Sequence, residues 1–431
     1  MEKEEFDAIV VGAGPAGTTA ALVMAKAGLN VALLERGDYP GAKNMYGGAI
    51  YRWPLELIVP NFAEKAPIER RIVDHRFMIL SKNSGLTFSF KNLYFANPPY
   101  NAFTTLRAKF DRWYARLAEE AGALLVTSVS VTDLIWNGKK VVGVMAGKGP
   151  ENELYSNIVI VADGANSKLA IQAGLRQPLS PREVALGVKE ILELDSKLIE
   201  SRFNLSEGEG VAIQVLGLTH GMMGGGFIYT NQNSLSIGLV ILLEHLIKSK
   251  IKPYELLEEF KSHPLIAPLI EGGEPKEYSA HLVPEVGYYG IPKLYTDGLM
   301  IVGDAASLTS SIHQEGVNMA IESGICAAKA AIKAKKLEDY SSKTLSYYEN
   351  LLKSSYTIRE LYQLRDLPKI FRDNPRLFGL YPSIINYAIG ELLSMNGELK
   401  GVKRQKIIKM IKQRVGFSKL LLDLIKMRKI I

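Results

Sequence analysis

The chain has 431 residues, 47% of them hydrophobic, so it can form two or three structural regions with substantial cores. Its net charge of +7 comes from one end, because residues 400–431 hold eleven Lys or Arg and one acid, Asp423. The one cysteine, Cys326, excludes an internal disulfide and any iron–sulfur cluster held by several thiolates of this chain alone. The acidic start and the lack of a long apolar run lead us to expect a cytoplasmic protein that can still touch a membrane.

The first forty residues carry the strongest signal. An apolar strand at residues 8–11 leads into Gly12-Ala13-Gly14-Pro15-Ala16-Gly17, a small-residue helix, and a second apolar strand that ends at Glu35. In such a motif Gly12 permits the tight turn, Gly14 lets the backbone approach phosphates, and Gly17 lets helix and strand pack closely. Glu35 can accept ribose hydroxyls and would repel a 2′-phosphate. The pattern therefore predicts a dinucleotide site for FAD or NAD.

The pattern of elements then becomes less regular. A Gly-rich loop at residues 41–48 leads into an irregular stretch with Trp53-Pro54 and Asn97-Pro98-Pro99. A helix is predicted from Arg107 to Gly122, followed by strands at residues 124–129, 131–136 and 141–146. Residues 158–162 are fully apolar, which is typical of a central parallel strand.

From residue 184 onward, the predicted pattern of elements changes. Strands at residues 227–230 and 235–239 and a helix at 253–263 predict a separate α+β domain over residues 184–284. The chain then returns through an apolar strand at 298–302 to Gly303-Asp304 and a helix at 316–334. Beyond residue 340 the sequence predicts helices, which we expect Pro375 and Pro382 to break into short pieces.

Three distant segments follow one plan, in which an apolar strand ends at a small or acidic residue. They are Gly12–Gly17 with Glu35, Ala162-Asp163-Gly164, and Ile301-Val302-Gly303-Asp304. The last two resemble the second and third FAD fingerprints of the glutathione-reductase-like flavoproteins. Considered singly, Asp163 and Asp304 could also be an Asx turn or a helix N-cap.

That resemblance implies a fold and four regions. We expect an α/β protein with a Rossmann-like FAD-binding domain at residues 1–183 and 285–340. The inserted α+β domain at residues 184–284 would handle substrate or quinone. Residues 341–431 would form a helical C-terminal region with a basic amphipathic tail.

Longer sequence segments resemble those of the electron-transfer-flavoprotein:quinone oxidoreductases, FixC branch. The resemblance covers nearly the whole chain, including the inserted domain. It implies an FAD-dependent enzyme that takes electrons from an electron-transfer flavoprotein and passes them to a quinone. The segments are Arg36, Gly41-Ala-Lys-Asn44, Gly47-Gly48, Thr105-Leu-Arg107-Ala-Lys-Phe-Asp111, Gly224-Gly-Gly-Phe227-Ile-Tyr-Thr230, Ser234-Leu-Ser-Ile-Gly-Leu239 and Asn374-Pro-Arg-Leu-Phe378.

The resemblance also implies a set of FAD contacts and requires neither a nucleophile nor a metal. The helix beginning near Gly316 would direct its N-terminal amides at the flavin pyrimidine, where partial positive charge stabilises added electron density. His313 is a candidate proton shuttle or a hydrogen-bonded structural histidine. The adenosine and pyrophosphate would contact Gly12, Gly14, Pro15, Ala16, Gly17, Glu35, Arg36 and Arg107. Lys43, Asn44, Gly47, Gly48, Asp304 and Gly316 would surround the ribityl chain and isoalloxazine, with Val317 and Asn318 also at the start of the helix. Further expected cofactor contacts are Val129, Asp163, Gly164 and Gly303.

Partners follow from the same resemblance. Full-length relatives carry a ferredoxin-like domain with a [4Fe–4S] cluster, whose cysteines are missing here. We therefore expect a separate small ferredoxin-like protein beside the α and β subunits of the electron-transfer flavoprotein, in a FixABCX-type complex. Some complexes of this type bifurcate electrons, with the bifurcating flavin on a partner.

Several alternatives remain at the level of sequence. The basic tail, with apolar residues among its lysines, could bind a peripheral membrane surface, pack on the protein body, or dock an acidic partner. Nucleic-acid binding is disfavoured, because no recognition motif accompanies the tail. Rival functions are a geranylgeranyl-reductase-like enzyme, an aromatic-hydroxylase-type flavin monooxygenase and a non-catalytic FAD-stabilised subunit. Cys326 stands among small residues, so we expect a buried helix position.

Overall fold

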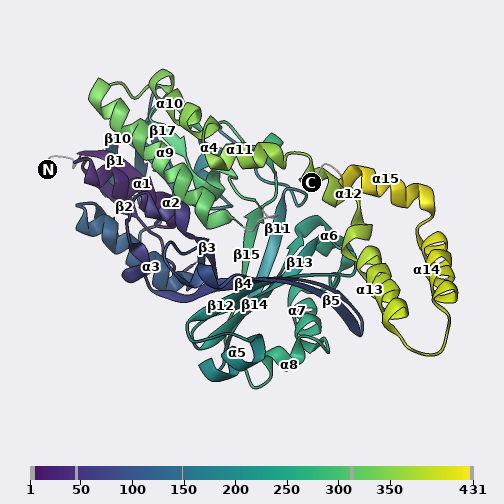
Figure 1. The fold of residues 1–431 in the computed structure, drawn as a ribbon. Helices are drawn as coiled ribbons and strands as arrows, with labels where there is room; N and C mark the ends of the chain where they lie inside the picture. Colours follow the sequence, from purple (N-terminus) through teal and green to yellow (C-terminus); the bar gives the residue numbers. More distant parts are fainter. Residues whose placement is uncertain (1–4, 44–46, 148, 311–314, 428–431) are drawn as a thin grey trace. The chain divides into compact units, whose positions relative to one another are not determined.

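The computed structural model describes residues 5–43, 47–147, 149–310 and 315–427. The chain divides into two compact units (Figure 1), each with its own hydrophobic core. Unit 1 comprises residues 1–69, 100–184 and 281–365, and unit 2 comprises residues 70–99, 185–280 and 366–431. Within the described ranges, no helix has the length and apolarity needed to span a bilayer.

A parallel sheet forms the centre of unit 1. The C-terminal halves of β1 and β10, residues 8–11 and 158–161, are apolar and buried on both faces, as expected for central parallel strands. An antiparallel pair, β8 (Asp133–Asn137) and β9 (Lys140–Met145), continues from β10. The parallel strands lie in the order β17 (Leu299–Ile301), β10 (Glu153–Val161), β1 (Glu5–Val11), β2 (Val31–Leu34) and β7 (Leu124–Val126).

Three helices pack together beside this sheet. Helix α1 (Pro15–Lys26) contacts both α9 (Gly316–Leu337) and α3 (Arg107–Glu120) (Figure 1). The approach of α1 to α9 is close, since a Cβ added at Gly324 would lie 2.4 Å from the carbonyl oxygen of Ala16. Cys326 is buried in α9, where desolvation raises the pKa of its thiol to about 12, so the expectation of a buried helix position is confirmed.

Unit 2 is built on an antiparallel sheet that contains one parallel pair, β12 with β4. The irregular stretch expected before Arg107 is wrong for β4 and β5, which form a long hairpin. Its pattern was hidden because β4 is buried while most of β5 is exposed. Neighbouring strands are β11 (Val184–Glu193), β14 (Ser234–Leu242), β13 (Gly224–Thr230), β12 (Glu209–Leu216), β4 (Ile68–Ser81) and β5 (Ser84–Lys91).

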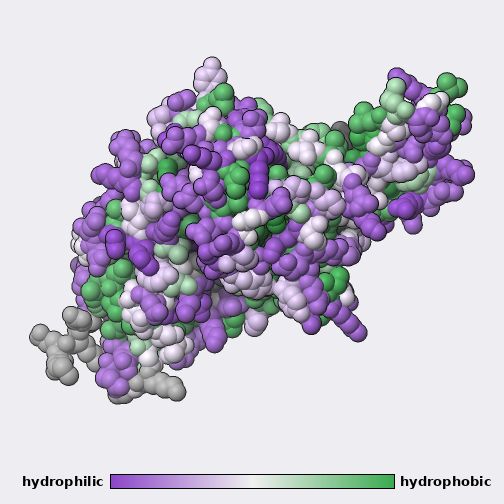
Figure 2. Space-filling view, turned by 90° about the horizontal axis from the view of Figure 1, so that it is seen from below, coloured by the Kyte–Doolittle hydropathy of each residue, from purple (hydrophilic) through white to green (hydrophobic). Residues whose placement is uncertain are grey.

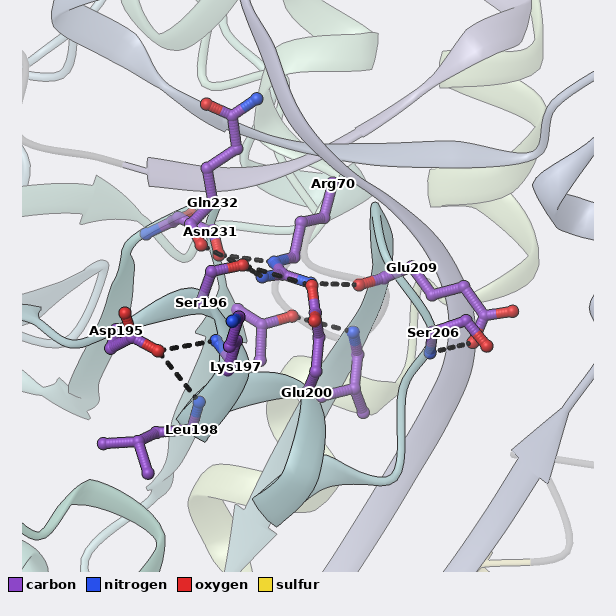
Figure 3. A network of polar contacts seen from close by, with 12 residues as sticks. Arg70, Asp195, Ser196, Lys197, Leu198, Glu200, Ser206, Glu209, Asn231 and Gln232 are labelled. Atoms are coloured by element: carbon purple, nitrogen blue, oxygen red, sulfur yellow. Dashed lines mark hydrogen bonds and ion pairs between the residues drawn. The ribbon is translucent and has the colours of Figure 1, made fainter.

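Arg70, near the start of β4, joins several segments of unit 2. Its side chain is 1% exposed, and each of its five N–H donors has an acceptor between 2.6 and 3.1 Å away (Figure 3). The acceptors come from helix α5 (Ser196–Phe203), from β12 and from the turn between β13 and β14. They are the carbonyls of Asn231, Gln232 and Glu209, the carboxylate of Glu200 and the hydroxyl of Ser196.

The C-terminal part of unit 2 is helical, as predicted. Pro375 does interrupt the helices, but Pro382 lies in the first turn of α13 (Leu380–Leu393), where a missing N–H costs nothing, so the break expected there is wrong. The basic tail forms α14 (Lys400–Arg414) and α15 (Phe417–Met427), which Gly416 separates with a φ of +78°. The chain thus divides at residue 365, where the sequence suggested a boundary at 340.

The remaining described elements complete the two units. In unit 1 they include β3 (Gly47–Tyr51), β6 (Ala102–Leu106), α2 (Arg52–Glu56), α4 (Lys168–Gln172), β16 (Tyr295–Thr296), α10 (Ser342–Lys353) and α11 (Tyr356–Gln363). In unit 2 they include α6 (Leu243–Ser249), α7 (Pro253–Ser262), α8 (Ala267–Ile270) and α12 (Leu367–Asp373). Strand β15 (Glu274–Pro284) spans the boundary between the units.

Candidate FAD site

The strand register brings the three predicted fingerprints into one row. Val11 lies opposite Val161 in the β1–β10 pair, and Val161 lies opposite Ile301 in the β10–β17 pair. On the other side, Val11 is paired with Leu34 at the end of β2. The residues that follow these four strand ends therefore lie at the same edge of one parallel sheet, where α/β proteins bind nucleotides.

The glycine loop at this edge is packed against its neighbours. Gly12 has a φ of +103°, and a Cβ there would lie 2.4 Å from the carbonyl oxygen of Ala162. A Cβ at Gly17 would lie 2.0 Å from the carbonyl oxygen of Gly12. Helix α1 begins at Pro15 with Gly14 as N-cap and no side-chain cap, so its first amides are available to an anion.

Glu35 holds the glycine loop in place. Its Oε2 accepts a hydrogen bond from the Ala13 N–H at 2.9 Å, and its Oε1 accepts one from the Gly37 N–H at 2.7 Å. The backbone carbonyl of Glu35 accepts from the N–H of Val129, which brings that predicted residue to the same place. Each carboxylate oxygen keeps acceptor capacity for a ribose hydroxyl.

Arg107 and Asp111 form a buried pair at the start of α3. The guanidinium makes two hydrogen bonds of 2.7 Å to the carboxylate, in the parallel arrangement that favours such pairs. Burial opposes the charge on Arg107, but the ion pair and hydrogen bonds with Asp111 raise its pKa, and Asp304 adds to the effect. Asp111 has no role among the predicted site residues, although its position four residues after an arginine on a helix is typical of such a pair.

Two carboxylates follow β10 and β17. Desolvation raises the pKa of Asp304 to about 6, although Arg107 and Arg176 act in the opposite direction. Desolvation likewise raises the pKa of Asp163, whose Oδ1 is buried and has no hydrogen-bond partner among the described residues. A cofactor hydroxyl beside Asp163 would supply the hydrogen bond that its Oδ1 lacks among the described residues.

Arg176 was missed by sequence analysis. Its guanidinium donates to the carbonyls of Ala305 at 3.0 Å and Ala165 at 2.5 Å, and so ties together the loops after β17 and β10. Burial lowers the pKa of Arg176, while Asp163 and Asp304 oppose that effect. Nothing in the local sequence marks this arginine, because its partners are backbone groups more than ten and more than a hundred residues away.

Gly47 and Gly48 lie beside the segment that leads into Arg107. In the antiparallel β3–β6 pair, Gly47 is opposite Leu106 and Gly48 is opposite Thr105. Among the described residues, a Cβ at Gly48 would meet no atom within 4 Å, and the buried hydroxyl of Thr105 has no hydrogen-bond partner. Space and an unsatisfied hydroxyl occur together here, as a bound group would require.

The N-terminus of α9 has a similar opening. In the part of the chain that the structure describes, the nearest atom to a Cβ added at Gly316 is 4.0 Å away, and the helix has no side-chain cap. The side chain of Asn318 is already engaged, since its amide bonds both the N–H and the carbonyl of Tyr51, at 3.2 and 2.9 Å. The main-chain amides of Gly316, Val317 and Asn318 are therefore the groups that this helix offers to a cofactor.

The other predicted residues are placed less directly. Gly164 follows Asp163, and Gly303 begins the short turn that contains Asp304. Arg36 and Lys43 are exposed. Desolvation lowers the pKa of His281, and the charges of Arg107 and Arg36 lower it further. Asn44 and His313 lie outside the described residues. Those described also include no group of His, Cys, Asp and Glu side chains able to hold a metal ion.

These observations fit FAD. The amides of α1 suit a pyrophosphate, Glu35 suits a ribose, and the open positions at Gly48 and Gly316 lie in segments that the resemblance assigns to the flavin. When bound, FAD supplies the electron-transfer chemistry, whereas the protein binds, orients and tunes it.

Solved structures share the fold. A geranylgeranyl bacteriochlorophyll reductase-like protein from Thermoplasma acidophilum is 21% identical with a TM-score of 0.74, covering 98% of this chain and 99% of that one. The myxobacterial FAD-dependent halogenase CndH is 19% identical with a TM-score of 0.69, covering 97% and 92%. At such identities the likeness shows the fold alone. Residues 7–177 match the FAD dependent oxidoreductase family model, and fold and site together define an FAD-dependent oxidoreductase.

Closer relatives identify the family. Protein FixC of Escherichia coli K12 is 42% identical over 426 residues, covering 98% of each chain, and FixC of Azorhizobium caulinodans is 41% identical over 413 residues, covering 95% of each. A probable electron transfer flavoprotein-quinone oxidoreductase of E. coli K12 is 41% identical over 429 residues, covering 99% of each. Residues 184–283 match the model "ETF-QO, ubiquinone-binding", and residues 367–431 match "ETF-QO/FixC family C-terminal domain". The chain belongs to the ETF-QO/FixC family.

Proposed function

We propose that this protein accepts electrons from an electron-transfer flavoprotein at its FAD and passes them to a membrane quinone. The main support is the row formed by the glycine loop, Asp163 and Asp304 at one edge of the unit 1 sheet, in a chain similar to FixC proteins over nearly its full length. The match of residues 184–283 to a ubiquinone-binding model supports a quinone as the acceptor.

We further propose that the protein works as one subunit of a FixABCX-type complex, which in some cases bifurcates electrons. The one cysteine of these 431 residues, Cys326, is buried and cannot hold a [4Fe–4S] cluster by itself, which supports a separate ferredoxin-like subunit as the carrier of the cluster. Affinity capture from native membranes should recover both electron-transfer flavoprotein subunits and a small iron–sulfur protein. Recovery of the protein alone from gently solubilised membranes would contradict the complex.

The function itself can be tested with the purified flavoprotein. We expect the reduced protein to be reoxidised rapidly by a water-soluble quinone analogue and slowly by oxygen, with a prenyl diphosphate left unchanged. The return of the flavin absorbance follows the first two reactions, and product analysis follows the third. Inertness toward quinone combined with saturation of the prenyl chain would overturn the proposal in favour of a geranylgeranyl-reductase-like activity. Rapid oxygen consumption with NAD(P)H would instead favour a monooxygenase.

A further inference from the structure

A buried carboxylate lies directly before helix α9. Glu315 is 8% exposed and precedes Gly316, the first of the residues whose amides this helix offers to a cofactor. Its backbone N–H donates to the carbonyl of Ser310 at 3.0 Å, which fixes the turn into the helix. The face drawn in Figure 2 mixes apolar and hydrophilic side chains, but Glu315 is an ionisable group held inside unit 1. Its charge lies where helix amides favour an anion and burial disfavours one.

Two tyrosines from other segments of unit 1 interact with this carboxylate. Tyr51 ends β3, the strand that contains Gly47 and Gly48, and its pKa is raised by desolvation and then by the charge of Glu315. Tyr356 begins α11, and its pKa is raised by desolvation, by the charge of Glu315 and by a hydrogen bond with Glu315. Both phenols therefore keep their protons at neutral pH and can donate to a carboxylate.

Tyr356 extends from this carboxylate to the surface. The residue is 38% exposed, so it contacts solvent as well as Glu315. Its ring packs edge-on against Trp53, with the two ring centroids 5.1 Å apart, and this contact fixes the direction of the side chain. A partly exposed hydroxyl that also bonds a buried carboxylate is suited to pass a proton between water and that carboxylate.

The other carboxylates near Tyr356 have different roles. Glu322 of α9 accepts from the backbone N–H of Tyr356 at 3.1 Å and from the N–H of Thr357 at 2.7 Å, so it holds the start of α11 against α9. After desolvation and Glu315, Glu360 adds less to the raised pKa of Tyr356. Glu315 is therefore the carboxylate that interacts most strongly with the Tyr356 hydroxyl.

The position of Glu315 conflicts with added negative charge. Helix α9 offers its first amides where electron density would rise in a reduced flavin, and Glu315 is the residue before those amides. Two like charges in one buried site are not both retained, because the pKa of one acidic group rises until it binds a proton. The addition of electrons should therefore draw a proton to Glu315.

We infer that Glu315 binds a proton as the bound FAD is reduced, and that Tyr356 is the positioning residue that links Glu315 to water. A proton leaves bulk water through the Tyr356 hydroxyl, and an O–H bond forms at a carboxylate oxygen of Glu315. When two electrons pass to a quinone, this O–H bond breaks and its proton becomes one of the two in the quinol. The inference rests on the proposed function, in which a protein supplies the electrons and water must supply the protons.

Spectroelectrochemical titration of the FAD-loaded protein between pH 6 and 8 counts the protons bound with the electrons. We expect the equilibrium constant for two-electron reduction to fall about tenfold more per pH unit in wild type than in Glu315→Gln, a difference of about 30 mV per pH unit. Glu315→Asp should restore the wild-type slope. The control Glu338→Gln, at the exposed C-cap of α9, should also keep it.

Infrared difference spectra give a second readout that does not depend on activity. The reduced-minus-oxidised spectrum of wild type should contain a protonated carboxyl band that Glu315→Gln lacks. Tyr356→Phe should keep the pH slope, because a proton path changes a rate and not an equilibrium. The same variant should slow proton uptake after photoreduction at least about tenfold, followed with a pH indicator dye.

Flavin absorbance and far-UV circular dichroism show whether each variant is folded and loaded. Equal slopes in wild type and Glu315→Gln would overturn the inference, as would a slope that Glu315→Gln keeps and His313→Asn loses. Unchanged proton uptake in Tyr356→Phe would overturn the assigned path. Electrochemical reduction uses neither the donor nor quinone, so the two proposals are separable. A protein with the Glu315-dependent slope that does not reduce quinone contradicts the proposed function alone.

Discussion

At the scale of single residues, charged side chains fix the loops of the candidate site through hydrogen bonds to backbone groups. Glu35 holds the glycine loop, and Arg176 ties the loops after β10 and β17 together through backbone carbonyls. Asp304 differs from both, since desolvation outweighs the nearby Arg107 and Arg176 and raises its pKa to about 6. The apoprotein therefore carries an unfavourable charge at the position where the cofactor is expected.

The raised pKa of Asp304 predicts a pH dependence of stability. Between pH 4 and 6 Asp304 holds its proton in the folded protein and releases it in the unfolded chain, so the contribution of this group to the free energy of unfolding falls as pH rises through this window, by up to about 3 kcal/mol. Urea unfolding of the FAD-free protein, followed by tryptophan emission, measures this fall, because Trp53, Trp113 and Trp136 all belong to unit 1.

Asp304→Asn should remove the decline and raise the stability of unit 1 at pH 8, while weakening FAD binding. The control Asp373→Asn, at the exposed end of α12, should keep the decline. A pH dependence between pH 4 and 6 that is the same in wild type and Asp304→Asn would contradict the assignment of a raised pKa to Asp304.

At the scale of elements, glycines serve two different purposes. Gly12, Gly17 and Gly324 are required by the protein itself, because an added Cβ would overlap neighbouring backbone. The glycines of β13 also serve packing, since a Cβ at Gly226 would lie 2.8 Å from the ring of Phe260. Gly48 and Gly316 instead border open space. Substitution of glycines of this second kind can therefore show whether a cofactor fills the space beside them.

This difference predicts separable effects of alanine. Gly48→Ala and Gly316→Ala should leave the stability of the FAD-free protein unchanged or slightly higher and weaken FAD binding by at least about tenfold, a loss of about 1.4 kcal/mol. Titration of the FAD-free protein with FAD, followed by flavin fluorescence, measures the affinity.

Two control variants, at Gly390 and Gly12, help to interpret that result. Gly390→Ala, at an open helical position in α13, should bind FAD like wild type and be more stable by about 1 kcal/mol. Gly12→Ala should lower the stability of the FAD-free protein itself, since a Cβ there would overlap the carbonyl oxygen of Ala162. Unchanged FAD affinity in Gly48→Ala would mean that the cofactor does not lie against β3.

At the scale of the whole molecule, two units with separate cores share one chain. The core of unit 1 surrounds the parallel sheet, and the core of unit 2 lies under its antiparallel sheet. The chain leaves unit 1 after Glu69 and immediately places Arg70 at the centre of unit 2. Its buried guanidinium makes five hydrogen bonds within unit 2, so the loss of Arg70 should affect unit 2 selectively.

Arg70→Met should therefore destabilise unit 2 while leaving unit 1 folded. Removing one member of a buried charged network costs about 3–5 kcal/mol, because its partners stay buried without it. In urea, far-UV circular dichroism should lose amplitude at a lower concentration than tryptophan emission, which reports unit 1. Arg202→Met, which removes an exposed bond to Glu271, should keep the two transitions as in wild type. Coincident early loss of both signals would show that the units unfold together.

The class of the protein and most of the strand-end residues of the site can be predicted from the sequence alone. Periodicity and turn chemistry are local, so the glycine loop, Glu35, Asp163 and Asp304 could be found from their spacing. Only the tertiary structure decided which groups complete the site, since Arg176 bonds distant carbonyls and Asn318 is occupied by Tyr51. The same holds for the hairpin that β4 and β5 form in unit 2 and for the exposure of the leucines of α15. Burial and long-range pairing set these features, and neither is encoded in a short stretch of residues.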